Sequence, residues 1–593
     1  MTVITIVADT GLTTAKRLAQ HFRCPIHGRA KECDVHIDNY KEHLTDLYRE
    51  EKSIVFVGAL GILIRLLAPS IAQNIKGAAV VVIAEDSSSI IPALGGHKGA
   101  NKLAREIGTL LNIEAAITTA SDIHFGIALD SPPQGYHLAN LKNYKDFMAK
   151  LLSGEEIVVE GNLPWIEDST LPISSDGTLI IKSGYTILPE SPSMLTYYTE
   201  CLAVGIGCER GVSNEEILTL VQTTLKKNQL AQESIAVIAS IDLKMDESAI
   251  NYLSAALNRP VRYFDAVSLE RLTPRLENPS RIVYNEVGCH GVAEAAALAA
   301  AGVESQLIVP KTKSAKATCA IATSSNVIDA NAIGCPRGKL FIVGIGPGKS
   351  DWLTPEAKNY IEKASDLVGY SLYITLLGNL GNTKNKHLFK LGEEKQRALT
   401  ALDLAASGRE VALISSGDPG IYAMASLVFD CLEEFNRTEW RRIEIIVSPG
   451  ISAFQACAAM AGAPLGHDFC SISLSDLLTP WATIERRLIS ACKGDFVIAL
   501  YNPVSQKRRQ QFHKAIHLVK KFRSGQTPVA IGQSLGRPLE DLIISELDDI
   551  ELHPIDMLSI IIIGNSQTRI VNKKIYTPRG YMKKQPKKNT ELK

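Results

Sequence analysis

Small and polar residues follow several apolar runs in the second half of the sequence, at positions where a ligand could meet the backbone. Glycines at strand ends leave backbone N–H and C=O groups open to a polar molecule. None of these turns supplies a basic cluster for a triphosphate, so we predict a small, aromatic or heteroaromatic ligand that is not highly anionic. The turns are Gly344–Gly348, Ser416–Gly420, Ser448–Ala453, Leu500–Pro503 and Gly564–Asn565.

The turn "LFIVGIGPGKS", residues Leu340–Ser350, comes close to two nucleotide-binding motifs and matches neither. The P-loop needs a glycine where Val343 stands, and the dinucleotide fingerprint needs its third glycine where Lys349 stands. Pro347 also removes a backbone N–H that a phosphate would use. Thr354, followed by a proline, is a good N-cap for a helix after the turn. Two interpretations stay open: a ligand site at a strand end, or a plain connection from strand to helix.

In the first half, polar residues and a glycine turn also follow apolar runs. Glu85 and Asp86 close a buried strand, which is the usual position for functional polar residues in an α/β sheet. The turn Gly95–Gly99 precedes an amphipathic helix predicted for Ala100–Leu111, and free N–H groups at a helix start suit an anionic group. His97 in this turn could be a base or a metal ligand, although a structural hydrogen-bonding role is the simpler alternative.

These residues must be positioned by short buried strands that alternate with helices along the whole chain. Continuous Val/Ile runs, in contrast to alternating ones, indicate strands that are buried on both faces, as in parallel sheets covered by helices. The predicted class is α/β, with several separate parallel-sheet domains. The strand candidates include "VITIVAD", "SIVFVGA", "AAVVVIAED", "SIAVIAS", "LFIVGIG", "EVALISSGD", "IEIIVSPG", "GDFVIALYN", "TPVAIGQSLG" and "LSIIIIGN".

Changes in composition suggest where the domains begin and end. Residues 130–200 are rich in Pro, Ser and Gly and suggest a smaller, looser module, and the small polar stretch before Leu340 suggests a linker. The last dozen residues lack apolar periodicity and predict a disordered basic tail. The predicted segments are 1–128, 129–200 and 201–325 in the first half, a linker at 326–338, two lobes at 339–446 and 447–581, and the tail at 582–593.

Composition excludes several classes of protein. The 593 residues are 46% hydrophobic and 21% charged, and 63 basic residues balance 63 acidic ones, so no basic excess points to nucleic acid. No run of 18 or more apolar residues predicts a membrane span. The eleven cysteines contain no C-x-x-C pair, so neither a zinc site nor a disulfide framework is predicted. We expect a cytoplasmic protein without a metal site of its own.

The second half resembles a known family. The motifs "VGIGPG", "SSGDPGIYAMAS", "SPGISAFQACAAMAGAPLGHDF", "LYNP", "IIIGNSQT" and "TPRGY" are similar to those of the tetrapyrrole methyltransferases of corrin synthesis, and more narrowly of the precorrin-3B or cobalt-precorrin-3 C17-methyltransferases. The resemblance covers residues 339–581. It implies two α/β lobes, a homodimer, a tetrapyrrole substrate, and S-adenosyl-L-methionine held between the lobes. Carried over by position, the implied donor contacts are Pro347, Gly417, Asp418, Ser452, Ala453, Tyr501 and Gly532.

The implied chemistry explains why no phosphate cradle is needed. The methyl donor carries its own cation, so the protein mainly supplies proximity and a dry pocket. The family reaction also contracts the macrocycle and closes a lactone, which calls for an acid or a base. His467, Asp468 and Asp476 are candidates, but a hydroxyl-rich capping loop explains each of them as well, and none is assigned as catalytic.

The first half, from about residue 1 to 325, resembles cobalt-precorrin-5A hydrolase. This resemblance implies hydrolytic opening of a ring-A lactone with release of acetaldehyde, but it carries no catalytic residues with it. From position and chemistry alone we assign Glu85 and His97 as catalytic, at neighbouring strand ends of a parallel sheet. Asp122, Cys208 and Arg210 are further candidates, although buried packing is the simpler interpretation of Cys208.

Three functional hypotheses follow. The first is a bifunctional enzyme of cobalamin biosynthesis, in which one half makes the lactone that the other half opens. The second keeps the same methyltransferase and makes the first half a non-catalytic tetrapyrrole-binding module. The third, a nucleotide-dependent ligase or kinase, is disfavoured because the turn at Leu340–Ser350 fails both phosphate motifs.

Overall fold

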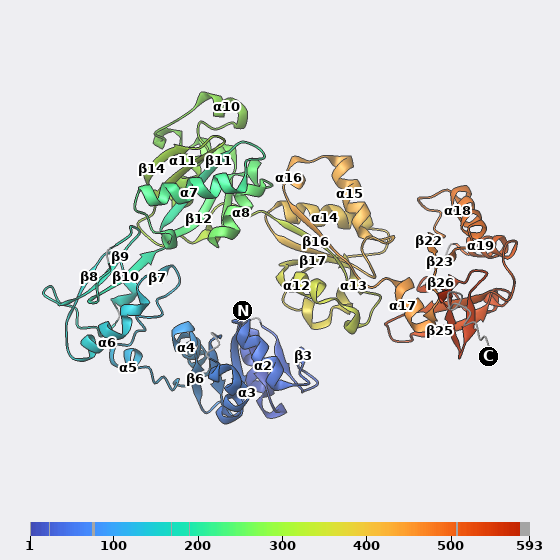
Figure 1. Cartoon of the computed structure of the whole chain (residues 1–593), viewed down its shortest axis with the longest axis horizontal. Helices are drawn as coiled ribbons and strands as arrows, with labels where there is room; N and C mark the ends of the chain where they lie inside the picture. Colours follow the sequence, from blue (N-terminus) through green and yellow to red (C-terminus); the bar gives the residue numbers. More distant parts are fainter. Residues whose placement is uncertain are drawn as a thin grey trace, which may run out of the picture. The chain divides into compact units, whose positions relative to one another are not determined.

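The computed structural model describes residues 2–581 except 23, 74–76, 168, 189 and 506–507, and it leaves out the side chains of residues 97 and 120–122. The chain forms two compact units, Met1–Arg337 and Gly338–Lys593. Figure 1 shows the first unit in blue to green and the second in yellow to red. The boundary between them lies inside the stretch 326–338 that the sequence predicts as a linker.

The first unit begins with a six-stranded sheet in the order β3-β2-β1-β4-β5-β6. Its first five strands are parallel, but β6 runs antiparallel to β5. Helices α1 and α4 cover one face of the sheet, and α2 and α3 cover the other. The elements are β1 (Thr2–Ile6), α1 (Leu12–Phe22), β2 (Ile26–Gly28), β3 (Val35–His36), α2 (Tyr40–Arg49), β4 (Ser53–Val57), α3 (Leu60–Ala72), β5 (Val80–Ile83), β6 (Ile90–Leu94) and α4 (Ala100–Leu111).

The middle part of the first unit is a four-stranded sheet, ordered β7-β10-β9-β8, with its own buried core. Phe147 and Tyr197 are fully buried in this core, and the Tyr197 hydroxyl donates to the Leu129 carbonyl at 2.5 Å. This part is therefore more regular than its Pro- and Ser-rich sequence indicates. The elements are α5 (Ala120–Phe125), β7 (Tyr136–Leu138), α6 (Tyr144–Leu152), β8 (Ile157–Glu160), β9 (Leu179–Gly184) and β10 (Met194–Thr199).

The last part of the first unit is a five-stranded sheet in the order β13-β12-β11-β15-β14. Strands β11, β12 and β13 are parallel, and β15 and β14 form an antiparallel hairpin beside β11. The elements are β11 (Leu202–Cys208), α7 (Asn214–Lys227), β12 (Ile235–Ile241), α8 (Ser248–Leu257), β13 (Val261–Phe264), α9 (Ala266–Glu270), α10 (Arg281–Val287), α11 (Ala293–Ala301), β14 (Gln306–Lys313) and β15 (Ala317–Thr323).

Lobe 1 of the second unit is an all-parallel sheet in the order β18-β17-β19-β16-β20. The predicted helix start after the glycine turn is confirmed, since the Thr354 hydroxyl accepts from Ala357 N at 3.1 Å and Pro355 begins the helix. The elements are β16 (Lys339–Gly344), α12 (Pro355–Lys363), β17 (Asp366–Tyr370), α13 (Ser371–Leu376), β18 (Asn385–Phe389), α14 (Glu394–Ala406), β19 (Glu410–Ser415), α15 (Met424–Phe435), α16 (Thr438–Arg441) and β20 (Glu444–Ser448).

Lobe 2 departs from the predicted parallel sheet. Its main sheet is ordered β22-β23-β26-β24-β25, and only the β22–β23 pair is parallel. The α/β class is confirmed, but the chain builds it from mixed sheets as well as parallel ones. The elements are α17 (Ala453–Ala461), β21 (Gly462–Ala463), β22 (Phe469–Ser473), α18 (Trp481–Lys493), β23 (Val497–Tyr501), α19 (Gln510–Lys520), β24 (Pro528–Gln533), β25 (Asp541–Glu546), β26 (Ser559–Ile563), β27 (Arg569–Val571) and β28 (Lys574–Tyr576).

A buried carboxylate at the start of β17 makes the stability of lobe 1 depend on pH. Asp366 is fully buried and accepts from His387 Nε2 at 2.9 Å, Arg409 Nη1 at 3.1 Å and Ser365 Oγ at 2.7 Å. Burial alone would raise the pKa of Asp366, but the bonds from His387 and Ser365 and the charge of Arg409 bring it below its usual value. The ionised form is thus bound in the folded state, and its contribution is present above the unfolded-state pKa and lost as pH falls through the folded-state pKa.

We therefore expect Asp366→Asn to lower the free energy of unfolding of lobe 1 by about 1–3 kcal/mol at pH 7. The variant should also lose less stability than the wild type as the pH falls below about 4, where a free aspartate becomes protonated. Urea unfolding at a series of pH values measures both effects. Asp430→Asn, at an exposed position on α15, is the matched control, and equal pH dependence of all three proteins would contradict the assignment.

Candidate active site

Three strand-end turns of lobe 1 meet closely enough that only glycine fits between them. A Cβ on Gly344 would lie 2.6 Å from the Gly417 carbonyl oxygen and 2.8 Å from the Gly450 nitrogen. Gly346 and Gly417 exchange backbone hydrogen bonds of 3.3 and 2.8 Å, and Gly346 has a φ of 70°. The glycines of the Leu340–Ser350 turn therefore bring backbone against backbone.

Asp418 ties two of these turns together. Its Oδ1 accepts from Gly420 N at 2.8 Å, and its Oδ2 accepts from Gly450 N at 3.2 Å. Both carboxylate oxygens are thus engaged by the backbone of the protein. The side chain holds the turn after β19 against the turn after β20, and so it shapes whatever site these turns surround.

Lobe 2 contributes an aromatic wall next to a capped helix. Ser452 is the N-cap of α17, and a capping box with Gln455 satisfies the first backbone N–H groups. Tyr501 ends β23, and its hydroxyl accepts from Phe454 N at 3.4 Å. Burial raises the pKa of the Tyr501 phenol, and the ring lies 5.2 Å from that of Tyr422. This arrangement fixes the Tyr501 ring as a rigid surface beside the start of α17.

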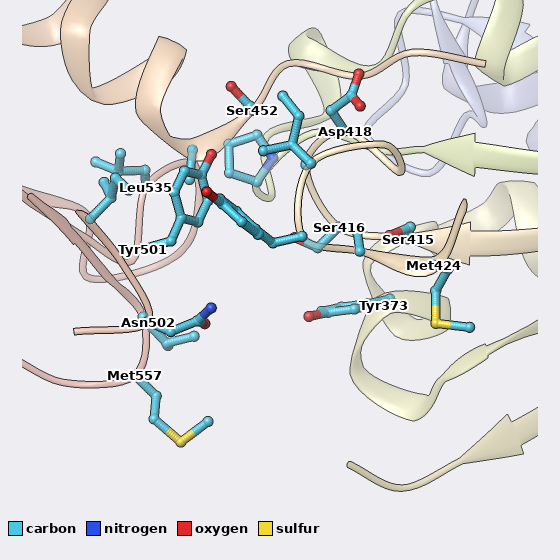
Figure 2. A pocket seen from close by; sticks show the side chains of 18 of the residues that line it. Tyr373, Ser415, Ser416, Asp418, Met424, Ser452, Tyr501, Asn502, Leu535 and Met557 are labelled. Carbon is cyan, nitrogen blue, oxygen red and sulfur yellow. The ribbon is translucent and has the colours of Figure 1, made fainter. Parts of the chain in front are cut away.

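The turns of lobe 1 and the wall of lobe 2 enclose a cavity of about 280 Å³. Figure 2 shows the Tyr373 hydroxyl and the Asn502 amide pointing into it from the two lobes. Six of the seven residues that the resemblance implies for the donor line this cavity, namely Pro347, Gly417, Asp418, Ser452, Ala453 and Tyr501. The seventh, Gly532, is absent from the described lining of the cavity. It lies in β24, where an added Cβ would meet Leu535 and Cys457, and Leu535 lines the cavity.

The cavity also has a polar end that was not predicted, formed by Tyr373, Glu394, Arg397 and Arg537. Arg537 donates through Nε to the Pro347 carbonyl at 2.8 Å and through Nη2 to Ser416 Oγ at 3.3 Å. Arg537 Nη1 and Arg397 Nε are buried and have no hydrogen-bond partner within the described part of the chain. Buried guanidinium N–H groups of this kind favour an anionic or carbonyl oxygen as their partner.

In the first unit, the structure separates the two residues predicted to act together. Glu85 follows the carboxyl end of β5, whereas Gly95–Gly99 follows β6, which is antiparallel to β5. Leu94 pairs with Val80 at the opposite end of β5, so the glycine turn lies at the other edge of the sheet. The prediction of neighbouring strand ends in a parallel sheet is therefore wrong. The side chains of His97 and Asp122 lie outside the described residues.

Glu85 is instead part of a polar cluster at the carboxyl edge of the sheet. The Thr10 hydroxyl donates to its carboxylate, and Thr14 Oγ1 lies 2.8 Å from Ser87 Oγ. An open cavity of about 520 Å³ adjoins this cluster, and its described charged lining residues are both acidic, Glu85 and Asp86. Such a lining repels anionic groups.

Comparisons with known proteins agree with this division of the chain. Residues 339–551 match the Tetrapyrrole (Corrin/Porphyrin) Methylases, residues 42–122 the Cobalamin synthesis G N-terminal domain, and residues 202–322 the Cobalamin synthesis G C-terminus. The precorrin-3B C(17)-methyltransferase of Sinorhizobium sp is 41% identical over 249 residues, which are 41% of this chain and 97% of that protein. The chain belongs to the tetrapyrrole methylase family.

Two further relatives extend the comparison. The cobalt-factor III methyltransferase of Priestia megaterium is 41% identical over 43% of this chain, and the chain spans only 47% of that relative's length. The crystal structure of the methyltransferase CobJ is 39% identical, covers 41% of this chain and 100% of its own, and has a TM-score of 0.39. The predicted fusion of a cobalamin synthesis G half with a methylase half is confirmed.

Other candidates in this tetrapyrrole methylase lie away from the cavity. Lys349 places its ammonium 5.7 Å from the Trp352 ring centre, and it is absent from the described lining. His467 Nδ1 accepts from Asp468 N at 2.8 Å. Asp476 accepts from Gln511 Nε2 at 2.6 Å, and its carboxylate lies 3.8 Å from Arg508 Nε. These contacts agree with the simpler interpretation of the three residues as hydrogen-bonded groups in the connections at the two ends of β22.

Cys208 and Arg210 lie at the end of β11 in the cobalamin synthesis G C-terminal domain. Burial raises the pKa of the Cys208 thiol to about 11, so the thiol stays protonated at neutral pH and is a poor nucleophile. Arg210 donates to Asp246 and to the Leu243 carbonyl, both at 2.6 Å. Both residues line a second cavity, of about 540 Å³.

No helix within the described part of the chain is long and apolar enough to cross a membrane.

Proposed function

We propose that the chain is a bifunctional enzyme of cobalamin biosynthesis. The methylase unit transfers a methyl group from S-adenosyl-L-methionine to C17 of precorrin-3B or cobalt-precorrin-3, with contraction of the ring. The cobalamin synthesis G half opens the lactone of cobalt-precorrin-5A with water and releases acetaldehyde. The observation that carries the proposal is the cavity of the methylase unit, where six residues implied for the donor lie together.

The lining of this cavity suits a sulfonium donor. S-adenosyl-L-methionine supplies an electrophilic methyl group on a cationic sulfur, so the protein needs no phosphate cradle. The backbone turns at Pro347 and Gly417 present polar groups to a ligand, and the aromatic rings of Tyr501 and Tyr422 offer flat surfaces that attract a cation. These groups orient the donor and exclude water, which is what methyl transfer to a carbon nucleophile requires.

The polar end of the same cavity suits carboxylates. Arg397 donates through Nη2 to Glu394 Oε1 at 3.0 Å, and its Nε, like Arg537 Nη1, is a buried N–H without a partner in the described structure, so each arginine has a donor left for an oxygen ligand. Burial raises the pKa of Tyr373, which therefore stays a neutral hydroxyl donor beside them. Both the donor and a corrin precursor carry carboxylates that could fill this end.

The two halves are chemically linked under this proposal. Ring contraction closes a lactone on the macrocycle, and lactone hydrolysis removes it at a later step. The substrates are tetrapyrroles, with or without cobalt, and any cobalt is held by the macrocycle and not by the protein. We further propose a homodimer formed through the methylase unit and a location in the cytoplasm.

The function is tested with the purified full chain. Incubation with S-adenosyl-L-methionine and either precorrin-3B or cobalt-precorrin-3 should give a product that has gained one methyl group and contains a lactone, as read by mass spectrometry. Incubation with cobalt-precorrin-5A should release acetaldehyde, which can be trapped and quantified. Failure of both substrates to accept a methyl group would overturn the methyltransferase assignment, and absence of the aldehyde would favour a non-catalytic first half.

Arg537→Met is expected to weaken S-adenosyl-L-methionine binding about tenfold or more, because a hydrogen bond to a charged group is worth about 1.5–3 kcal/mol. The substitution removes the bond to the Pro347 carbonyl as well as the free N–H. Isothermal titration measures the Kd, and Lys349→Met, which changes a charge beside the same turn but outside the cavity, should leave it unchanged. An unaltered donor Kd together with a higher KM for the tetrapyrrole would assign Arg537 to the substrate instead.

A further inference from the structure

The second large cavity of the first unit lies where strands β11 and β12 end, in the cobalamin synthesis G C-terminal domain. Its volume is about 540 Å³, and it is bounded by the end of β11, the start of α11, helix α10 and the β14–β15 hairpin. The carboxyl ends of parallel strands are the usual place for a ligand in an α/β domain. The volume is in the range of pockets that hold small organic molecules.

Positive charge dominates the wall of this cavity. Five cationic side chains line it, namely Arg210, Lys244, Lys311, Lys313 and Lys316. The chain as a whole is neutral, with 63 basic and 63 acidic residues, so this concentration is local. These cations outnumber the three lining carboxylates, of which Glu294 is buried; Glu209 and Glu286 are exposed, as are Arg210, Lys313 and Lys316. A cleft with an excess of one sign of charge attracts ligands of the opposite sign.

The buried Glu294 joins the elements around the cavity, and both of its carboxylate oxygens are engaged by N–H donors. Its carboxylate accepts from Lys311 N at 2.9 Å, from Glu277 N and Asn278 N at 3.0 Å, and from Asn278 Nδ2 at 2.9 Å. Burial alone would raise the pKa of Glu294, but these bonds hold it below its usual value, so the group is ionised and satisfied. It joins the first turn of α11 to β14 and to the segment before α10.

The start of α11 adds donors to the same wall. Helix α11 begins at Ala293, and Val292, its N-cap residue, provides no side-chain cap within the described structure. Residues Gly291, Val292 and Ala293 line the cavity, so the start of the helix lies beside it, and the free N–H groups of a helix start favour an anion. Lysine side chains and a helix start thus surround one space.

Burial disfavours the charged form of Lys311. Its Nζ donates to the Asn278 carbonyl at 2.8 Å, and burial, followed by repulsion from Lys313, lowers the pKa of the ammonium group while Glu294 opposes the change. A bound carboxylate would offset both effects, because an opposite charge within a few ångströms favours the charged form. A bound carboxylate would therefore stabilise the charged form of Lys311 more than water does.

We propose that this basic cavity is where the first unit binds the carboxylate side chains of its tetrapyrrole substrate, and that the acidic cavity beside Glu85 is not. The inference rests on the proposed function, since acetate and propionate side chains are the anionic groups of a corrin precursor. It moves the expected substrate site of the hydrolase half from the first domain, with Glu85 and His97, to the domain that contains Arg210.

The test uses uroporphyrin III, a porphyrin whose acetate and propionate side chains are all carboxylic acids, with the full chain. Hydrogen–deuterium exchange should show that the probe protects peptides covering residues 207–211 and 311–318, and not residues 58–60 and 84–89. This readout separates the basic cavity from the methylase cavity, which can also take a tetrapyrrole.

The triple variant Lys311→Gln, Lys313→Gln, Lys316→Gln should raise the Kd of the protected site at least about tenfold and reduce its dependence on salt, because screened charge attraction is lost. The matched control Lys145→Gln, Lys226→Gln, Lys227→Gln removes the same charge from exposed positions of the same unit and should leave the Kd within about twofold. Equal effects of the two variants, or protection around Glu85, would overturn the inference.

Failure of the inference and failure of the proposed function give different results. If wild-type protein releases acetaldehyde from cobalt-precorrin-5A and the triple variant does so equally well, the hydrolase stands and the basic cavity is not its substrate site. If no aldehyde is released but uroporphyrin III still protects residues 311–318 in a lysine-dependent manner, the binding site stands and the hydrolase assignment falls.

Discussion

Gly344→Ala is expected to abolish S-adenosyl-L-methionine binding by the methylase unit, with an increase in Kd of about 100-fold or more. The new Cβ would lie 2.6 Å from the Gly417 carbonyl oxygen, 2.7 Å from Pro419 Cδ and 2.8 Å from Gly450 N. Two of these three neighbours are backbone atoms, so no flexible side chain can swing away. The turns must separate, and overpacking of this kind costs about 1–3 kcal/mol or more.

The same displacement would disturb the geometry of the proposed donor site. Asp418 bridges the turns after β19 and β20 through Gly420 and Gly450, and it cannot keep both bonds if Gly450 moves. Because Pro347, Gly417 and Ser452 lie on the three displaced turns, the lining of the cavity shifts together with them. A misplacement of about 1 Å is enough to lose most of the benefit of preorganised binding groups.

Gly381→Ala in the same lobe is the matched control. A Cβ there meets only side-chain atoms, Leu367 Cδ1 and Lys386 Cε, at 3.4 Å. Calorimetric titration gives the donor Kd, and circular dichroism with urea unfolding shows whether the variant is folded. Near-normal donor affinity in a folded Gly344→Ala protein would mean that the donor does not depend on the contact of these turns.

The meeting of the three predicted ligand turns in lobe 1 was predictable because each of them follows a strand directly. Gly344, Ser415 and Ser448 end adjacent parallel strands, and the carboxyl ends of parallel strands share one edge of a sheet. The local sequence therefore indicates that these turns lie close together at one edge of the sheet. By contrast, Arg537 bonds to Pro347 across 190 residues, and Arg397 sits within a helix whose sequence reads as an ordinary charged face. No local pattern distinguishes these arginines.

The predicted proximity of Glu85 and the Gly95–Gly99 turn is wrong because the strand between them is antiparallel to β5. The strands predicted from the sequence include none between Glu85 and the glycine turn, but Ile90–Leu94 turns back along β5 as an antiparallel edge strand. The tight turn lies between Ala84 and Ser89, where Ser87 has a φ of 59°, and its aspartate and serines, which favour turns, were the available sequence signal. Because β6 runs antiparallel to β5, the turn that follows it lies at the opposite edge of the sheet from Glu85.

The antiparallel strands of lobe 2 escaped prediction for a related reason. "LSIIIIGN" and "TPVAIGQSLG" are continuous apolar runs because helices cover both faces of their sheet, and burial on both faces also occurs in parallel sheets. Ser559–Ile563 and Pro528–Gln533 nevertheless pair antiparallel. Composition reports how deeply a strand is buried and does not report its direction, which depends on the connections between strands.

The other large effect is expected from Gly205→Ala, in the first unit. Gly205 lies in the middle of β11, and a Cβ there would lie 1.9 Å from the Ala293 carbonyl oxygen and 2.7 Å from Ala297 N. Both are backbone atoms of α11, a helix of small residues that rests directly on the strand. The helix would have to move as a body, at a cost of about 3 kcal/mol or more.

Such a movement would reach the basic cavity, because α11 carries Glu294. The four hydrogen bonds to this carboxylate join α11 to β14 and to Glu277–Asn278, and a buried ionised group that loses its donors is strongly destabilised. Uroporphyrin III binding at residues 311–318 and acetaldehyde release should therefore both fall at least about tenfold, while methyl transfer by the second unit stays normal. Gly184→Ala, which places its Cβ in open space in β9, should change neither. If Gly205→Ala kept full probe binding, the position of α11 would be irrelevant to the basic cavity, and the helix start would have no part in holding the ligand.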